Sequence, residues 1–130
     1  MSQYDEAAQA LYSDEARQRW GDTDAFRESE QRTAGYTEDD WSALRDGMDE
    51  IIEGFAKLKQ RGVAPDHEKP RLQVRKLRQF ISDRMYNCTD EILAGLGELY
   101  IFDERFTKQI DRHGEGTAAY IAACIRAVLP

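Results

Sequence analysis

Apolar residues recur at helical spacing along most of this chain, and this periodicity restricts the fold more than any other feature. In the longest run, from Trp41 to Leu58, they recur every three or four positions, which would give one apolar face on a long helix. No segment shows a convincing strand-like alternation of apolar and polar residues. The pattern therefore predicts an all-α domain.

Local signals predict where the helices begin and end. Thr37 and Asp40 have the spacing of a variant capping box, and Gly62 can end that helix in the left-handed conformation. Proline is tolerated in a first turn, so the next helix should begin within residues 66–70. The remaining helices are expected to follow an N-cap at Thr89 and to cover residues 103–112 and 117–129.

The N-terminal third differs from the rest. Residues 1–40 contain 11 acidic and 4 basic residues and so hold the whole net charge of −7, whereas residues 41–130 contain 14 of each. Residues 1–36 can bury little apolar surface against an ordering cost of about 1–2 kcal/mol per residue. We expect them to form a flexible helical lid that orders on a ligand, and residues 37–130 to form the helical core.

Composition excludes several classes of protein. An acidic chain is a poor match for phosphates, so direct nucleic-acid binding by this chain is not expected. No apolar run approaches the roughly 20 residues of a membrane span, and the N-terminus lacks the features of a signal peptide. With Cys88 and Cys124 as its two cysteines, the chain is expected to be a cytoplasmic protein with reduced thiols.

Metal binding and catalysis are not expected either. His67, His113 and the two cysteines lack ligand spacing, so no metal or other cofactor is predicted, and His113 is expected to cap a helix. The chain has no glycine-rich phosphate loop and no nucleophile elbow, and no carboxylate pair can be named as an acid–base couple. We therefore predict that it is not an enzyme.

Cys88 has the most reactive setting in the sequence. It directly precedes the expected N-cap Thr89, and Arg84 lies one turn earlier, so both would favour the thiolate. A small buried residue at a helix corner is the alternative. Gly95 and Gly97 each cost their helix about 1 kcal/mol, which indicates close approach of another helix or of a ligand.

Two aromatic residues lie in segments too polar to bury them locally, namely Trp20 and Tyr36. Trp41 and Phe55 instead have the spacing of core residues, and Cys124 lies on an alanine-rich core face. An acidic segment with aromatic side chains beside a helical body is typical of a lid over an apolar cleft.

Several segments of this chain resemble the TipA-type antibiotic-recognition domain, in the order and spacing of that family. They are residues 19–26, 32–41, 86–88, 95–100, 103–107 and 118–120. The resemblance implies a globin-like helical fold without haem and an N-terminal segment that closes over a bound ligand. Members usually form the effector half of MerR-type transcriptional activators or are made as free drug-binding proteins.

The resemblance also implies ligands, namely thiopeptide antibiotics or other large drugs such as albicidin. In the thiopeptide binder, the cysteine that matches Cys88 adds to a dehydroalanine of the antibiotic. Leu77 and Met85 depart from that member, so the ligand preference is expected to differ. The chain begins at a methionine and lacks the DNA-binding half, which suggests a stand-alone binder or a fragment of a regulator.

Our leading hypothesis is a module that binds large apolar antibiotics or macrocyclic peptides, with possible covalent capture by Cys88. The alternative is a protein-interaction module whose cleft takes an amphipathic helix of a partner. An exposed cleft would also allow weak homodimers. The expected ligand-binding residues are Trp20, Phe26, Tyr36, Trp41, Phe55, Met85, Tyr86, Gly95, Leu96, Leu99 and Tyr100.

Overall fold

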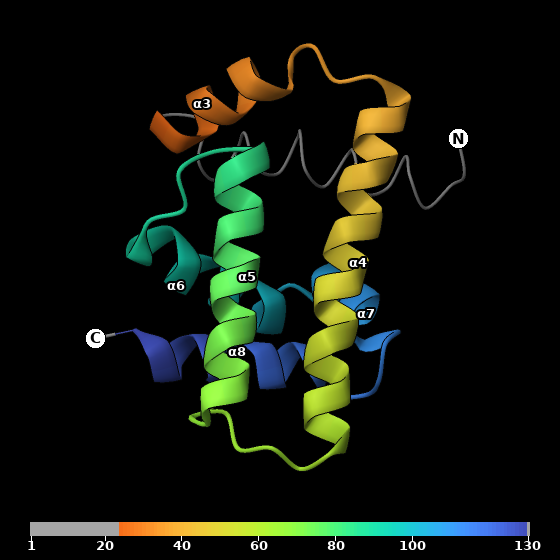
Figure 1. The fold of residues 1–130 in the computed structure, drawn as a ribbon, viewed down its shortest axis with the longest axis vertical. Helices are drawn as coiled ribbons and strands as arrows, with labels where there is room; N and C mark the ends of the chain where they lie inside the picture. The colour runs from red at the N-terminus through yellow and green to blue at the C-terminus, as the bar shows by residue number, and fades with distance from the viewer. Residues whose placement is uncertain (1–23, 130) are drawn as a thin grey trace.

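The computed structural model describes residues 24–129, and within them every regular element is an α-helix. This agrees with the all-α prediction. The helices are α3 (Asp24–Thr33), α4 (Glu38–Gln60), α5 (Glu68–Arg84), α6 (Asp90–Phe102), α7 (Glu104–Asp111) and α8 (Thr117–Val128). Figure 1 shows α4 and α5 side by side, α3 across the end where α5 finishes, and α8 crossing behind the pair.

The predicted helix ends are confirmed. Thr37 caps α4 and forms a complete capping box with Asp40, and Gly62 follows the helix with a φ of 72°. Pro70 lies in the first turn of α5, where its missing N–H costs nothing. Thr89 caps α6 by accepting a hydrogen bond from the N–H of Ile92.

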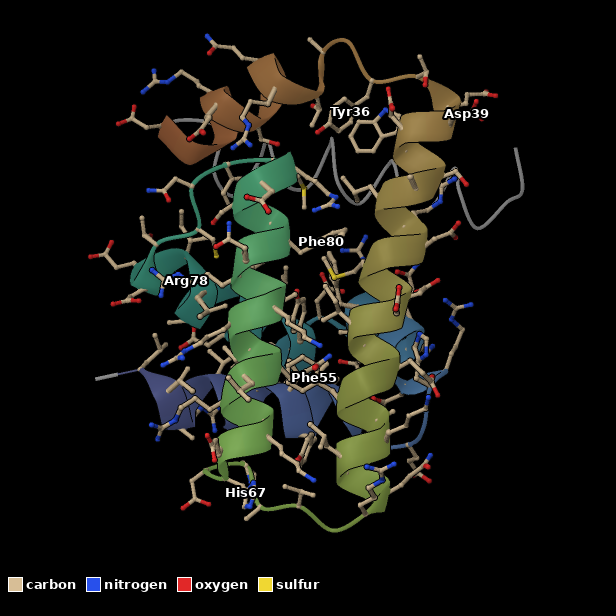
Figure 2. All side chains as sticks on the ribbon, in the orientation of Figure 1. Tyr36, Asp39, Phe55, His67, Arg78 and Phe80 are labelled. Atoms are coloured by element: carbon tan, nitrogen blue, oxygen red, sulfur yellow. The ribbon has the colours of Figure 1, made fainter. Side chains whose placement is uncertain are left out.

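The core gathers around α8, which contacts α4, α5, α6 and α7. Small and branched residues of α8 let the other helices come close, and Cys124 is fully buried among them, as predicted. Phe55 of α4 fills the space towards α5, as Figure 2 shows. The core cluster consists of Phe55, Val74, Leu77, Ile81, Met85, Cys88, Leu93, Ile110, Ala118, Ile121, Cys124 and Ile125.

Two glycines of α4 let α5 approach closely. A Cβ added at Gly47 would lie 2.5 Å from Cε2 of Phe80, and one added at Gly54 would collide with the amide of Gln73. That amide donates a hydrogen bond of 2.9 Å to the carbonyl of Ile51. The helix propensity lost at each glycine, about 1 kcal/mol, is therefore linked to close helix packing.

Candidate functional site

The turn between α5 and α6 carries Cys88, and α5 holds both of its backbone groups. Nε of Arg78 donates a hydrogen bond of 2.8 Å to the Cys88 carbonyl, and the Cys88 N–H donates one of 3.1 Å to Oγ of Ser82. Figure 2 shows Arg78 on the side of α5 that faces α6. Arg78 also binds Asp90 in the first turn of α6, with 2.6 Å between Nη1 and Oδ1. The turn is thus fixed to both of its helices.

A second set of bonds joins α3 and the segment after it to the turn and to the end of α5. Oε1 of Glu28 accepts a hydrogen bond of 3.2 Å from the N–H of Asn87, and Nη2 of Arg32 donates one of 2.6 Å to the carbonyl of Asp83. Glu28 and Arg32 also pair with each other at 3.1 Å. The hydroxyl of Tyr36, just after α3, donates to the carbonyl of Arg84. Helix α3 therefore lies over the C-terminal end of α5 (Figure 1), and Glu28 binds the residue that precedes Cys88.

Of the two alternatives for Cys88, this arrangement favours the small buried residue at a helix corner. The side chain is 1% exposed, and burial raises the pKa of its thiol from 9.0 to about 11. The cation that opposes this rise is Arg78 rather than Arg84, whose guanidinium carbon lies 4.1 Å from the centre of the Phe80 ring. Sequence spacing predicted the helix N-terminus correctly, but it did not reveal that the thiol points into the core.

The aromatic residues of the predicted site form two groups. Tyr36 and Trp41 are half-buried and meet edge to face, with 5.4 Å between their ring centres, beside the α3–α4 connection. Tyr100 lies near Cys88 and its ring centre is 6.3 Å from that of Phe106. Burial, followed by the charge of Cys88, raises the pKa of Tyr100.

Several other predicted contact residues belong to the core. Phe55, Met85 and Leu99 are buried, while Tyr86 and Leu96 are half-buried and pack against the core cluster. As ligand contacts they remain predictions, and the three buried ones would need this part of the core to open. Trp20 and the side chain of Phe26 lie outside the part of the chain that the structure describes.

The two glycines of α6 have different surroundings. Gly97 is buried against α8, where an added Cβ would lie 3.5 Å from Cδ1 of Ile125. That distance is an ordinary van der Waals contact, so α8 leaves room for a methyl group at this position. Gly95 is half-buried, and an added Cβ would meet no atom within 4 Å. Helix packing thus requires neither glycine, and Gly95 has the open space where a ligand could approach the helix.

The histidines have roles other than those predicted. His67 is the helix cap, because its Nδ1 accepts a hydrogen bond of 3.1 Å from the N–H of Lys69 at the start of α5. His113 instead joins the end of α7 to α4, with Nδ1 2.7 Å from Oε2 of Glu53 and Nε2 3.5 Å from Oδ1 of Asp49. No group of three or more potential metal ligands occurs within residues 24–129.

Sequence reasoning did not identify Arg78, Ser82 or Glu28 as residues of this site. Arg78 and Ser82 are one turn apart on α5, so their shared face could have been recognised, but their target was not predictable. Glu28 reaches Asn87 across 59 positions of sequence, and no local pattern indicates that contact.

None of the described helices is both long and apolar enough to cross a membrane.

Comparison with known proteins identifies close relatives. The profile of the TipAS antibiotic-recognition domain matches residues 12–128. The HTH-type transcriptional activator TipA of Streptomyces lividans is 41% identical over 116 residues, which make up 89% of this chain and 46% of TipA. The HTH-type transcriptional activator mta of Bacillus subtilis is 39% identical over 120 residues, or 92% of this chain and 46% of mta. The chain thus spans about half the length of these relatives.

A solved structure shares the fold. It is TipAS from Streptomyces lividans in complex with nosiheptide, described as part of a thiopeptide antibiotic multidrug resistance system. The two chains superpose with a TM-score of 0.80 at 41% identity, over 89% of this chain and 81% of that one. This likeness and the family profile agree on fold and on sequence. This chain therefore belongs to the TipAS antibiotic-recognition domain family.

Proposed function

We propose that this chain binds a large, mostly apolar antibiotic of the thiopeptide class and serves as a cytoplasmic drug sensor or drug-sequestering protein. The observation that carries this proposal is the likeness to TipAS in complex with nosiheptide, at a TM-score of 0.80 and 41% identity. TipA and mta, which match this chain over about half of their length, are transcriptional activators. In a longer regulator, this chain would supply the sensing half.

The proposed binding region lies between α3 and the α5–α6 turn. Hydrogen bonds of Glu28 to the turn and of Arg32 to the end of α5 hold α3 in place, and such bonds exchange readily with water. Tyr36, Trp41 and Tyr100 offer half-buried aromatic surface nearby. Displacement of α3, followed by its return over the drug, would admit a ligand too large for a closed core. Residues 1–36 would act as the lid.

Covalent capture would follow if the drug carries a dehydroalanine. The Cys88 thiol would give its proton to water, and the thiolate sulfur would bond to the β-carbon of the dehydroalanine. The carbon–carbon double bond would become single, and the α-carbon would take a proton from water. No group leaves and no electrons are lost, and the product is a stable thioether between Cys88 and the drug. One protein would capture one drug, without the turnover of an enzyme.

Titration calorimetry with nosiheptide tests the binding proposal. We expect a single site per chain, and a Gly95→Val variant should bind at least tenfold more weakly, because its side chain would occupy the open space beside α6. The matched control is Ala43→Val, at an exposed position of another helix. Absence of heat and of any change in tryptophan emission with nosiheptide would contradict the proposal for this drug.

Mass spectrometry of the denatured protein tests the covalent step separately. After incubation with a dehydroalanine-bearing thiopeptide, we expect the mass of one added drug in the parent protein and none in Cys88→Ala. An adduct that persists in Cys88→Ala would assign the reaction to another nucleophile. Binding without an adduct would retain the sensor and remove covalent capture from its mechanism.

A further inference from the structure

Cys88 has a cation fixed beside it by the fold itself. Arg78 donates to the Cys88 carbonyl through Nε at 2.8 Å, and its Nη1 is held by Oδ1 of Asp90 at 2.6 Å. The Arg78 guanidinium is therefore held between the backbone carbonyl of Cys88 and the carboxylate of Asp90 at the start of α6. Ser82, one turn further along α5, fixes the Cys88 N–H but carries no charge.

The charged and titratable groups near the thiol come from three helices. Arg78 belongs to α5, Asp90 and Tyr100 belong to α6, and Glu28 of α3 binds the neighbouring amide of Asn87. Burial has the largest effect on the pKa of Cys88 and raises it, Arg78 lowers it, and Asp90 raises it. Arg78 is thus the group that favours the thiolate, and Asp90 opposes it.

Building on the covalent capture proposed above, we propose that Arg78 is a positioning residue for Cys88. It holds the Cys88 backbone in the turn, and its guanidinium stabilises the negative sulfur that attacks the unsaturated drug. Asp90 orients Arg78 and limits its effect, while burial keeps the thiol of the free protein unreactive. When a drug displaces the groups that bury Cys88, Arg78 would stay at this residue, because it is bonded to the Cys88 carbonyl and to Asp90.

Acrylamide tests this role in the whole chain without any antibiotic. It is an α,β-unsaturated amide, and it reacts as dehydroalanine would: sulfur bonds to the β-carbon and the α-carbon gains a proton. The rate of Cys88 modification would be followed by peptide mass spectrometry from pH 7 to pH 12, which brackets the raised pKa of the thiol. The midpoint of the profile reports thiolate stability, whereas its upper plateau reports how often the turn opens.

Four variants distinguish the effect of the Arg78 charge on the thiolate from the role of Arg78 in holding the turn. In Arg78→Gln we expect the midpoint to rise, so the rate at pH 8 falls about threefold to tenfold, since one pH unit is a tenfold change in thiolate fraction. Arg78→Lys should restore most of the rate. Asp90→Asn should lower the pH of the midpoint, because Asp90 opposes the thiolate. The matched control Arg75→Gln, which removes an equal charge from an exposed position of α5, should leave the profile unchanged.

Two results would overturn the proposal. If Arg78→Gln changes the plateau but not the midpoint, Arg78 only holds the turn together. If Arg75→Gln moves the midpoint equally, general charge rather than position is responsible. Should Arg78→Gln fail to fold by circular dichroism, Asp90→Asn still decides, because an unmoved midpoint there contradicts the electrostatic role. Loss of nosiheptide binding would not affect these results, so failure of the proposed function is distinguishable.

Discussion

At the scale of single residues, two buried thiols should make the folded state less stable at alkaline pH. Cys88 and Cys124 lie in the core, and burial raises the pKa of each thiol from 9.0 to about 11. The unfolded chain ionises its thiols first, near pH 9, while the folded chain keeps them protonated up to about pH 11. The folded state therefore loses stability as pH rises through this interval.

This predicts a steeper fall in stability for the parent protein than for a variant without the thiols. Between pH 8.5 and pH 10, the urea midpoint of the parent should fall further than that of Cys88→Ala/Cys124→Ala, whichever is more stable at pH 7. Urea unfolding at three pH values measures both slopes. Equal slopes would mean that other groups cause the alkaline loss, and Tyr120, whose pKa is raised to about 12, would be examined next.

At the scale of helices, the glycines differ in whether close helix packing requires them. Gly47 and Gly54 allow close contact between α4 and α5, whereas an added Cβ at Gly97 would make only ordinary contact with α8 and one at Gly95 would face open space. Sequence analysis identified the two α6 glycines from their cost to a helix. It overlooked Gly47 and Gly54, because which face of α4 meets α5 depends on the tertiary arrangement.

Alanine substitution should therefore have opposite effects at Gly47 and Gly95. Gly47→Ala should destabilise the protein by about 1–2 kcal/mol, because its Cβ would force the Phe80 ring to shift. Gly95→Ala should stabilise it by up to about 1 kcal/mol, because alanine favours the helix and has room. Urea unfolding of both variants checks the prediction, and destabilisation at Gly95 would show that packing needs that glycine.

The attachment of α3 is a second property of helices. Glu28 bonds to the α5–α6 turn and Arg32 to the end of α5, while Arg27 pairs with the exposed Asp24 of its own helix. In Glu28→Ala/Arg32→Ala, hydrogen exchange of the α3 amides in the free protein should become faster. Arg27→Ala is the matched control and should exchange like the parent. Equal exchange in all three proteins would mean that these bonds do not hold α3.

At the scale of the whole molecule, periodicity and helix caps predict most of the fold. The all-α class, the capping box at Thr37, Pro70 in a first turn and the cap at Thr89 all depend on residues close in sequence. The contacts that shape the site do not. Glu28 and Asn87 are 59 positions apart, and His113 and Glu53 are 60, so their pairing follows from helix packing alone.

The same limit explains why the sequence left two alternatives open for Cys88. A helix N-terminus can be predicted from Thr89 and its neighbours, but whether the preceding side chain points to solvent or to the core depends on helices far away in sequence. Burial outweighs the cation beside the thiol. The family resemblance points to this residue for covalent capture, and because its thiol is buried, the proposed reaction would require the turn to open.

Hydrogen exchange with and without nosiheptide would test most directly whether this chain recognises a thiopeptide where α3 meets the α5–α6 turn. With saturating drug, we expect the amides of residues 24–36 and 85–89 to exchange at least tenfold more slowly, because the drug and the closed lid would shield both segments. The end of α4 near Lys57 should be unchanged and serves as the internal reference. Unchanged exchange in both segments, or protection confined to another part of the chain, would contradict the proposed site.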